Sequence, residues 1–170
     1  MKKVHLDITA EKIRSGELTP REAAAPMFAA VDLSGPYIGY ISDVSLFNGE
    51  QTTVFSVAGY LDSVCAGGHE KFLYNPEGRL WREAILALDI IGAEEAAENL
   101  RNVRNKFPED ISFDLEARAA AIEENDLYFD EEDAYIKEHE SEVRRLLEEY
   151  TKANAEAFEF TGDVEFPQEQ

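Results

Sequence analysis

Residues 80–107 read LWREAILALDIIGAEEAAENLRNVRNKF, and two helical patterns follow one another in this stretch. Over residues 80–91 apolar side chains recur every three or four positions, which is the spacing of one helix face. Gly92 ends that run, and a second helical pattern follows over residues 93–107. Glycine suits a helix end because it adopts the left-handed backbone conformation at no steric cost. We therefore predict two helices joined by a tight turn, an αα-hairpin.

Upstream of this hairpin, a strong helix signal begins at Asn48 and ends at the pair Gly67-Gly68. Asn48 with Gln51 three residues later is typical of a helix start, and apolar residues then recur at helical spacing. The step Asn48-Gly49 also suits the turn of a β-hairpin, so this alternative stays open.

Two further helices are predicted nearer the N-terminus. Thr19-Pro20-Arg21-Glu22 combines a capping box with proline at the first helical position, which predicts a helix to Val31. A bend is expected near Pro26, because proline disrupts a helix interior. Residues 33–47 are also predicted to be helical.

Beyond Pro108 the sequence predicts two more helices and a loose end. Ser112 is expected to cap a helix over residues 113–124, and a long helix with one apolar face follows over 131–158. Residues 161–170 are predicted to form a flexible acidic tail. The expected fold class is all-α: a single compact multi-helix domain over residues 1–160, with αα-hairpins and a long acidic C-terminal helix.

Acidic residues are concentrated in the last third of the chain. The last 63 residues contain 21 of the 36 Asp and Glu but only 5 of the 16 Lys and Arg, a net charge of −16 out of −20. Such self-repulsion opposes compaction, so it calls for an explanation. An acidic protein is repelled by nucleic acid and by anionic membranes. We expect its partners to be basic proteins or cations, and neither nucleic acid nor a membrane.

Several kinds of chemistry find no support in the sequence. Cys65 is the single cysteine, and His5, His69 and His139 lack the spacing of a metal site. The acidic run 126–133 lacks the glycine and alternating ligands of a calcium loop. We therefore expect no enzyme, cofactor or metal. A cytoplasmic protein is expected, because there is no secretion signal and no apolar stretch of membrane length.

A set of short motifs in the middle of the chain carries a family resemblance. Gly67-Gly68-His69-Glu70-Lys71-Phe72-Leu73-Tyr74-Asn75 precedes an Ile91-Gly92-Ala93 turn, and Asp126-Leu127-Tyr128 and Tyr135 follow. This ordered set resembles a bacterial family of small acidic proteins, first described as a domain of unknown function, whose best-known member is a DNA-mimic protein. The resemblance covers about residues 48–158. It implies an all-helical homodimer whose acidic surface occupies the DNA-binding face of a helix-turn-helix transcription factor.

Charge and resemblance together predict a DNA mimic that blocks operator binding and thereby regulates transcription. Duplex DNA carries one charge per ~1.7 Å of its axis. Residues 130–159 carry 11 acids and 4 bases, which at ~1.5 Å per helical residue is one net charge per ~6 Å. One helix is too sparse, so a second copy has to complete the surface. The predicted partner-binding residues are Glu123, Glu124, Asp126, Asp130, Glu131, Glu132, Asp133, Glu138, Glu142, Glu149 and Glu156.

The alternative function is an acidic protein-interaction or immunity-type module that binds one basic partner by shape, without DNA mimicry. Binding by a mimic should weaken steeply with salt. Changing Glu131, Glu132 and Asp133 to Lys should abolish it without unfolding the protein, whereas a shape-driven module should keep most of its binding.

Overall fold

The computed structural model describes residues 1–166, which form nine α-helices, two 3₁₀ helices and one two-stranded sheet. The fold is therefore mostly all-α, as predicted. The chain divides into two compact units, Met1–Phe55 with Leu147–Gln170 (unit 1) and Ser56–Leu146 (unit 2). The single domain expected over residues 1–160 stays a prediction.

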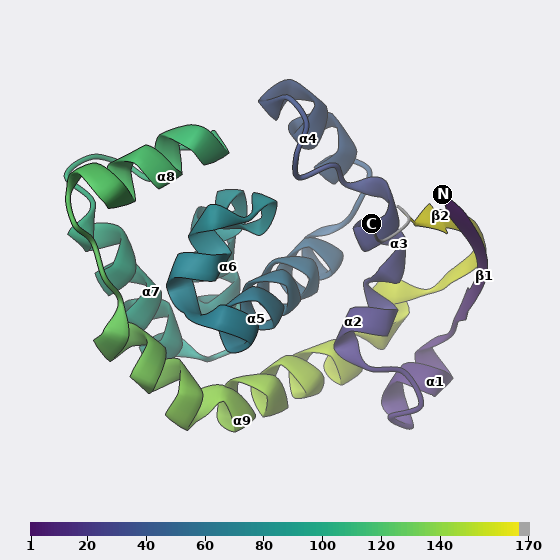
Figure 1. The fold of residues 1–170 in the computed structure, drawn as a ribbon. Helices are drawn as coiled ribbons and strands as arrows, with labels where there is room; N and C mark the ends of the chain where they lie inside the picture. Colours follow the sequence, from purple (N-terminus) through teal and green to yellow (C-terminus); the bar gives the residue numbers. More distant parts are fainter. Residues whose placement is uncertain (167–170) are drawn as a thin grey trace. The chain divides into compact units, whose positions relative to one another are not determined.

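The sheet of unit 1 joins the two ends of the chain. Strand β1 (Lys2–Ile8) pairs antiparallel with β2 (Phe160–Phe166), from Lys2 opposite Phe166 to Ile8 opposite Phe160 (Figure 1). The predicted loose tail is therefore wrong over residues 161–166, and its last four residues lie outside those described. The reason is strand pairing, which satisfies the backbone of both segments.

Unit 1 also contains several short helices. They are α1 (Ala10–Arg14), α2 (Pro20–Ala23), α3 (Ala25–Ala30), α4 (Tyr37–Val44) and the 3₁₀ helix η2 (Ala155–Phe158). The capping box at Thr19 is confirmed, since its Oγ1 accepts from Glu22 N at 3.2 Å and Glu22 Oε2 accepts from Thr19 N at 2.8 Å. The break falls at Ala24, two residues before Pro26, and the helix predicted over 33–47 is shorter than expected.

Helix α5 (Gly49–Tyr74) contributes residues to both units. Asn48 Oδ1 accepts from Gln51 N at 2.8 Å, and Gln51 Oε1 accepts from Asn48 N at 3.1 Å, so the hairpin alternative is wrong. The predicted break at the two glycines is confirmed, because both depart from helical geometry and Gly68 has φ +76°. A Cβ on Gly68 would clash with a carboxylate oxygen of Asp133.

Unit 2 is built mainly from helices. Besides most of α5 it contains the 3₁₀ helix η1 (Pro76–Leu80), α6 (Trp81–Ile90), α7 (Glu94–Lys106), α8 (Leu115–Glu124) and the larger part of α9 (Asp130–Ala153). The αα-hairpin of α6 and α7 is confirmed, with Gly92 at φ +85° in its turn (Figure 1). The core of the unit includes Tyr60, Leu61, Phe72, Leu73, Leu80, Leu88, Leu100, Val103, Phe129 and Ile136.

Two helix boundaries in the acidic third differ from prediction. Asp114 caps α8 by accepting from Ala117 N at 2.9 Å, whereas the hydroxyl of Ser112 accepts from Asp114 N and orders the loop before the helix. Helix α9 ends at Ala153 instead of continuing to residue 158, and η2 follows it.

Candidate protein-binding surface

A tight turn between α8 and α9 positions the densest group of carboxylates. Asn125 ends α8 and Asp126 adopts φ +48°. Leu127 N donates to Ile122 O at 3.0 Å, and Asp126 N donates to Glu123 O at 3.4 Å. These two bonds form a Schellman motif, which fixes the direction in which the chain leaves the helix. Acidic residues then open α9, where they complement the positive end of the helix dipole.

The structure exposes most of the predicted binding residues. Nine of the eleven side chains are exposed: Glu123, Glu124, Asp126, Asp130, Glu131, Glu138, Glu142, Glu149 and Glu156. Glu149 and Glu156 belong to unit 1 and the other seven to unit 2. Glu132 is buried and Asp133 is half-buried, so neither belongs to the exposed group. Their assignment as partner-binding residues stays a prediction.

Glu132 is buried and anchors α9 to α7. Its side chain is 7% exposed, and its Oε2 lies 2.7 Å from Lys106 Nζ. Asn99 of α7 also donates to the Glu132 carbonyl at 3.1 Å. A buried carboxylate requires such a partner, because desolvation of an unpaired charge is costly. Glu132 therefore has a structural role, linking α9 to α7.

Asp133 anchors α9 to the kink of α5. Its Oδ1 accepts from the backbone N–H of His69 at 2.8 Å and lies 2.6 Å from His69 Nδ1. On the other side of the buried imidazole, Tyr60 OH lies 2.8 Å from Nε2. Partial burial would raise the pKa of Asp133, but the hydrogen bonds from His69 outweigh it and lower that pKa. The contacts among Asp133, His69 and Tyr60 therefore link the start of α9 to helix α5.

A buried arginine fixes α8, and sequence reasoning missed it. Arg118 is 1% exposed and donates to the carbonyls of Leu73, Ser112, Phe113 and Asn75 at 2.8 to 3.0 Å. Burial, and secondly the nearby Arg79, lower the pKa of Arg118 to about 10. A lone arginine on an alanine-rich helix was the available signal.

Several exposed carboxylates already have partners inside the chain. Glu142 pairs with Arg145 at 2.5 Å, Glu156 pairs with Arg14, and Tyr74 OH donates to Glu123 at 3.5 Å. By contrast, four exposed carboxylates beside the α8–α9 turn form no ion pair within residues 1–166. We call these four, Glu124, Asp126, Asp130 and Glu131, the acidic patch.

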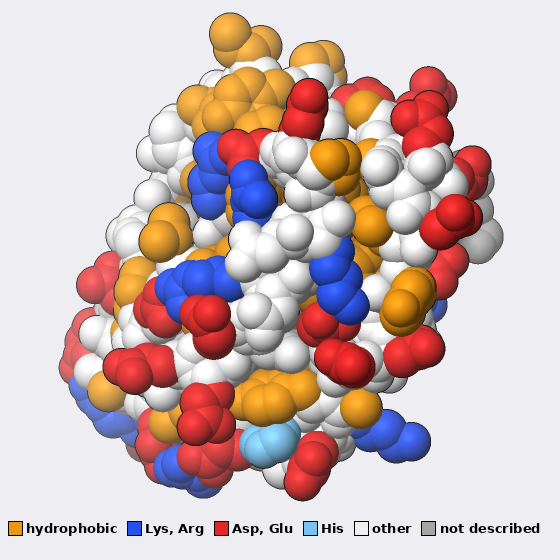
Figure 2. Space-filling view, turned by 90° about the vertical axis from the view of Figure 1, so that its left-hand side faces the viewer, with side chains coloured by type: hydrophobic (Ala, Val, Ile, Leu, Met, Phe, Trp, Pro, Cys, Tyr) orange, Lys and Arg blue, Asp and Glu red, His pale blue; other side chains and the backbone are white. Residues whose placement is uncertain are grey.

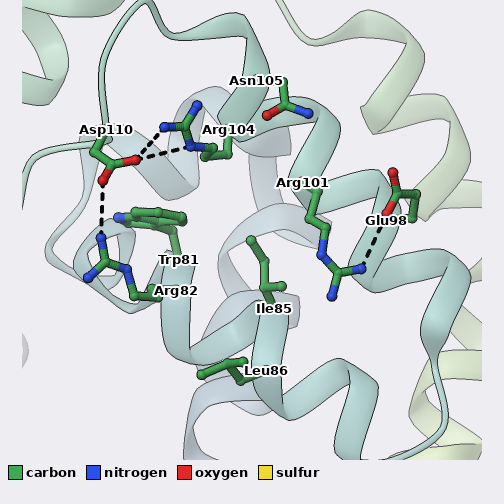
Figure 3. A pocket seen from close by; sticks show the side chains of 9 residues that line it. All are labelled: Trp81, Arg82, Ile85, Leu86, Glu98, Arg101, Arg104, Asn105 and Asp110. Atoms are coloured by element: carbon green, nitrogen blue, oxygen red, sulfur yellow. Dashed lines mark hydrogen bonds and ion pairs between the residues drawn. The ribbon is translucent and has the colours of Figure 1, made fainter.

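Helices α6 and α7 form a groove of about 380 Å³, which we call the arginine groove (Figure 3). Its wall includes Trp81, Arg82, Ile85, Leu86, Glu98, Arg101, Arg104, Asn105 and Asp110. Arg82 Nη2 lies 3.4 Å from Asp110, and Arg104 Nε donates to the same carboxylate at 3.1 Å. Arg101 pairs with Glu98 at 3.3 Å and with Asp89. Carboxylates of the chain therefore match all three guanidinium charges.

A second groove, of about 300 Å³, lies between the start of α7 and helix α9. We call it the tyrosine groove; its wall includes Gly92, Ala93, Glu94, Glu95, Ala96, Tyr135, His139, Glu142, Val143 and Leu146. Tyr135 and His139 are half-buried in it. On the side of the molecule where α7 and α8 lie, Figure 2 shows acidic side chains around a histidine and hydrophobic groups.

Among the described residues, no group of three or more His, Cys, Asp or Glu is arranged to hold a metal ion. Over residues 1–166, no helix has both the length and the apolar composition needed to cross a membrane.

Comparison with known proteins identifies a family. The family model described as DMP19-like protein matches residues 45–154, more than half of the chain. This match agrees in extent with the resemblance found over residues 48–158. No curated protein and no solved structure matches the chain.

Proposed function

Since the chain belongs to the DMP19-like protein family, we propose that it is a DNA mimic that regulates transcription. Its acidic surface binds the DNA-binding face of a bacterial helix-turn-helix transcription factor and blocks operator binding. It acts in the cytoplasm as a homodimer, without catalysis and without a cofactor.

The observation that carries this proposal is the unmatched charge of the acidic patch. Glu132 and Asp133 pair with side chains of the chain, whereas Glu124, Asp126 and Asp130 are exposed and form no ion pair within residues 1–166. Unmatched charges of one sign create a potential that attracts a partner of the opposite sign and speeds association. A DNA-binding face, rich in Lys and Arg, is such a partner.

The position of the acidic patch supports mimicry further. A Schellman motif and the buried Arg118 fix the segment that carries it, so the carboxylates need little ordering on binding. Because a single helix remains too sparse in charge, two copies related by a two-fold axis complete the surface, as two half-sites complete an operator.

The experiment that tests the proposal is affinity capture. The immobilised protein is incubated with a bacterial lysate with and without competing duplex DNA, and bound proteins are identified by mass spectrometry. We expect DNA-binding proteins that the duplex displaces. Captured proteins that duplex DNA does not displace would instead support the shape-driven alternative.

The structure also improves the charge variant used in such experiments. Changing Glu131, Glu132 and Asp133 together to Lys removes two internal anchors, so lost binding would not distinguish a lost surface from a lost fold. The patch variant Glu124→Gln, Asp126→Asn, Asp130→Asn and Glu131→Gln changes exposed side chains only. Exposed positions of this kind tolerate substitution with little change in stability.

A further inference from the structure

The tyrosine groove differs from the rest of the acidic surface because it has an aromatic wall. The rings of Tyr135 and His139 stack with centroids 4.1 Å apart and an interplanar angle of 15°. They lie one turn apart on α9, and His139 Nδ1 lies 2.8 Å from the Tyr135 carbonyl. A carbonyl only accepts, so Nδ1 donates, and in the neutral ring Nε2 is left as an acceptor.

Two carboxylates beside these rings have no basic partner among residues 1–166. Glu94 and Glu95 are exposed at the start of α7, and neither forms an ion pair within the described residues. Glu142, the third carboxylate of the groove, is already paired with Arg145. Glu95 and Tyr135 both line the groove. Burial first, and the charge of Glu95 second, raise the pKa of Tyr135.

The net potential of the groove favours a cation. The N-terminus of a helix carries about half a positive elementary charge, which opposes a cation at the start of α7. Glu94 and Glu95 together carry about two negative charges at neutral pH, so the carboxylates outweigh the dipole. Aromatic ring faces attract cations as well.

We propose that the tyrosine groove binds one arginine side chain of a basic partner. The guanidinium lies against Tyr135 and His139 and donates hydrogen bonds to Glu94 and Glu95. Arginine fits better than lysine because its planar group stacks on rings, pairs with carboxylates through two bonds and is more weakly hydrated. The basic nature of the partner rests on the proposed function.

The test uses a small probe, N-acetyl-arginine-N-methylamide, followed by NMR of the aromatic protons of Tyr135 and His139. We expect saturable shifts with the arginine probe, at least fivefold weaker binding of the lysine analogue, and no binding of the uncharged citrulline analogue. Equal shifts with citrulline would overturn the proposal, since charge would then play no part.

Variants show whether the probe binds in the groove. Changing Glu94 and Glu95 to Gln, or Tyr135 to Leu, should weaken probe binding at least fivefold. The matched control changes Glu109 and Glu116 to Gln, which removes the same charge from exposed positions outside the groove. If the control variant weakens probe binding equally, then binding depends only on the net charge of the protein. That result would contradict the proposal that the probe binds in the tyrosine groove.

The probe experiment is independent of the DNA-displacement experiment. If the arginine probe does not bind but DNA-displaced proteins are captured, the groove assignment is wrong and the proposed function stands. If the probe binds as expected and no DNA-binding protein is captured, the groove stands and the proposed function fails.

Discussion

Helix α7 contributes to two grooves of unit 2. The grooves differ in whether their charged side chains have ion-pair partners inside the chain. In the arginine groove, Arg82, Arg101 and Arg104 all pair with carboxylates of the chain (Figure 3). In the tyrosine groove, Glu94 and Glu95 have no base within the described residues. Matched charges need no partner outside the chain. Unmatched ones in a protein of net charge −20 attract a basic partner.

The same contrast recurs within the first turn of α9. Glu132 and Asp133 contact Lys106 and His69 and hold the helix in place, whereas Asp130 and Glu131 are exposed and form no ion pair in the described part of the chain. Four consecutive acidic residues thus divide into a structural pair and a pair available for binding. The number of acidic residues in the sequence therefore exceeds the number of carboxylates that are exposed to a partner.

The largest expected effect comes from breaking a matched charge. Changing Asp133 to Ala removes the acceptor for the backbone N–H and the ring of His69, which is fully buried. Leaving buried donors unsatisfied should lower the free energy of unfolding by about 2–4 kcal/mol. Denaturant unfolding measures this. The control Glu138→Ala, on the exposed side of α9, should change it by about 0.5 kcal/mol or less. A similar loss of unfolding free energy in both variants would contradict the distinction between structural and exposed carboxylates.

A second, smaller effect is expected in the pH dependence of the unfolding free energy, to which the ionised Asp133 contributes. The hydrogen bonds from His69 outweigh partial burial and hold the pKa of Asp133 below its unfolded value, which is about 3.9. Its contribution to stability is therefore fully present above about pH 4 and is lost as pH falls through the folded pKa. In acid titrations of the unfolding free energy, Asp133→Asn should show a shallower decline below pH 4 than the unaltered protein. Equal slopes would count against a stabilising role of the ionised carboxylate.

The smallest effect is expected when arginines of the arginine groove lose their carboxylate partner. Asp110→Asn removes the carboxylate shared by Arg82 and Arg104. Because this pair is exposed, stability should fall by at most about 1 kcal/mol. The freed arginines should then bind anions, so sulfate should raise the melting temperature of the variant more than that of the unaltered protein at equal ionic strength. An identical response of both proteins to sulfate would refute the explanation by charge matching.

Local signals in the sequence predict the helices well. The capping boxes at Thr19 and Asn48, the break at Gly68 and the turn at Gly92 are confirmed because each depends on residues only a few positions apart. The sheet escapes prediction because β1 and β2 pair across more than 150 residues, with no turn between them. Alternation in β1, with Val4, Leu6 and Ile8 on one face, was the available signal.

The roles of the acidic residues are harder to predict for the same reason. Glu132 and Asp133 resemble their neighbours in sequence, and their partners Lys106 and His69 lie 26 and 64 residues away. One signal was available for Glu132, which lies one turn before the buried Ile136 on the apolar side of α9. Family resemblance predicts that an acidic surface exists, but the three-dimensional contacts decide which carboxylates belong to it.

In the proposed function, exposed carboxylates of the acidic patch compete with DNA for a basic protein. A captured DNA-binding protein is loaded onto a fluorescently labelled duplex, and the measurement is the concentration of the acidic protein that releases the duplex. The patch variant should need about 100-fold more protein, or about 2.7 kcal/mol. A control with equal charge loss at Glu11, Glu17, Glu109 and Glu116 should stay within about threefold of the unaltered protein, because those charges lie outside the patch. Equal potency of the patch variant and the unaltered protein would contradict the account.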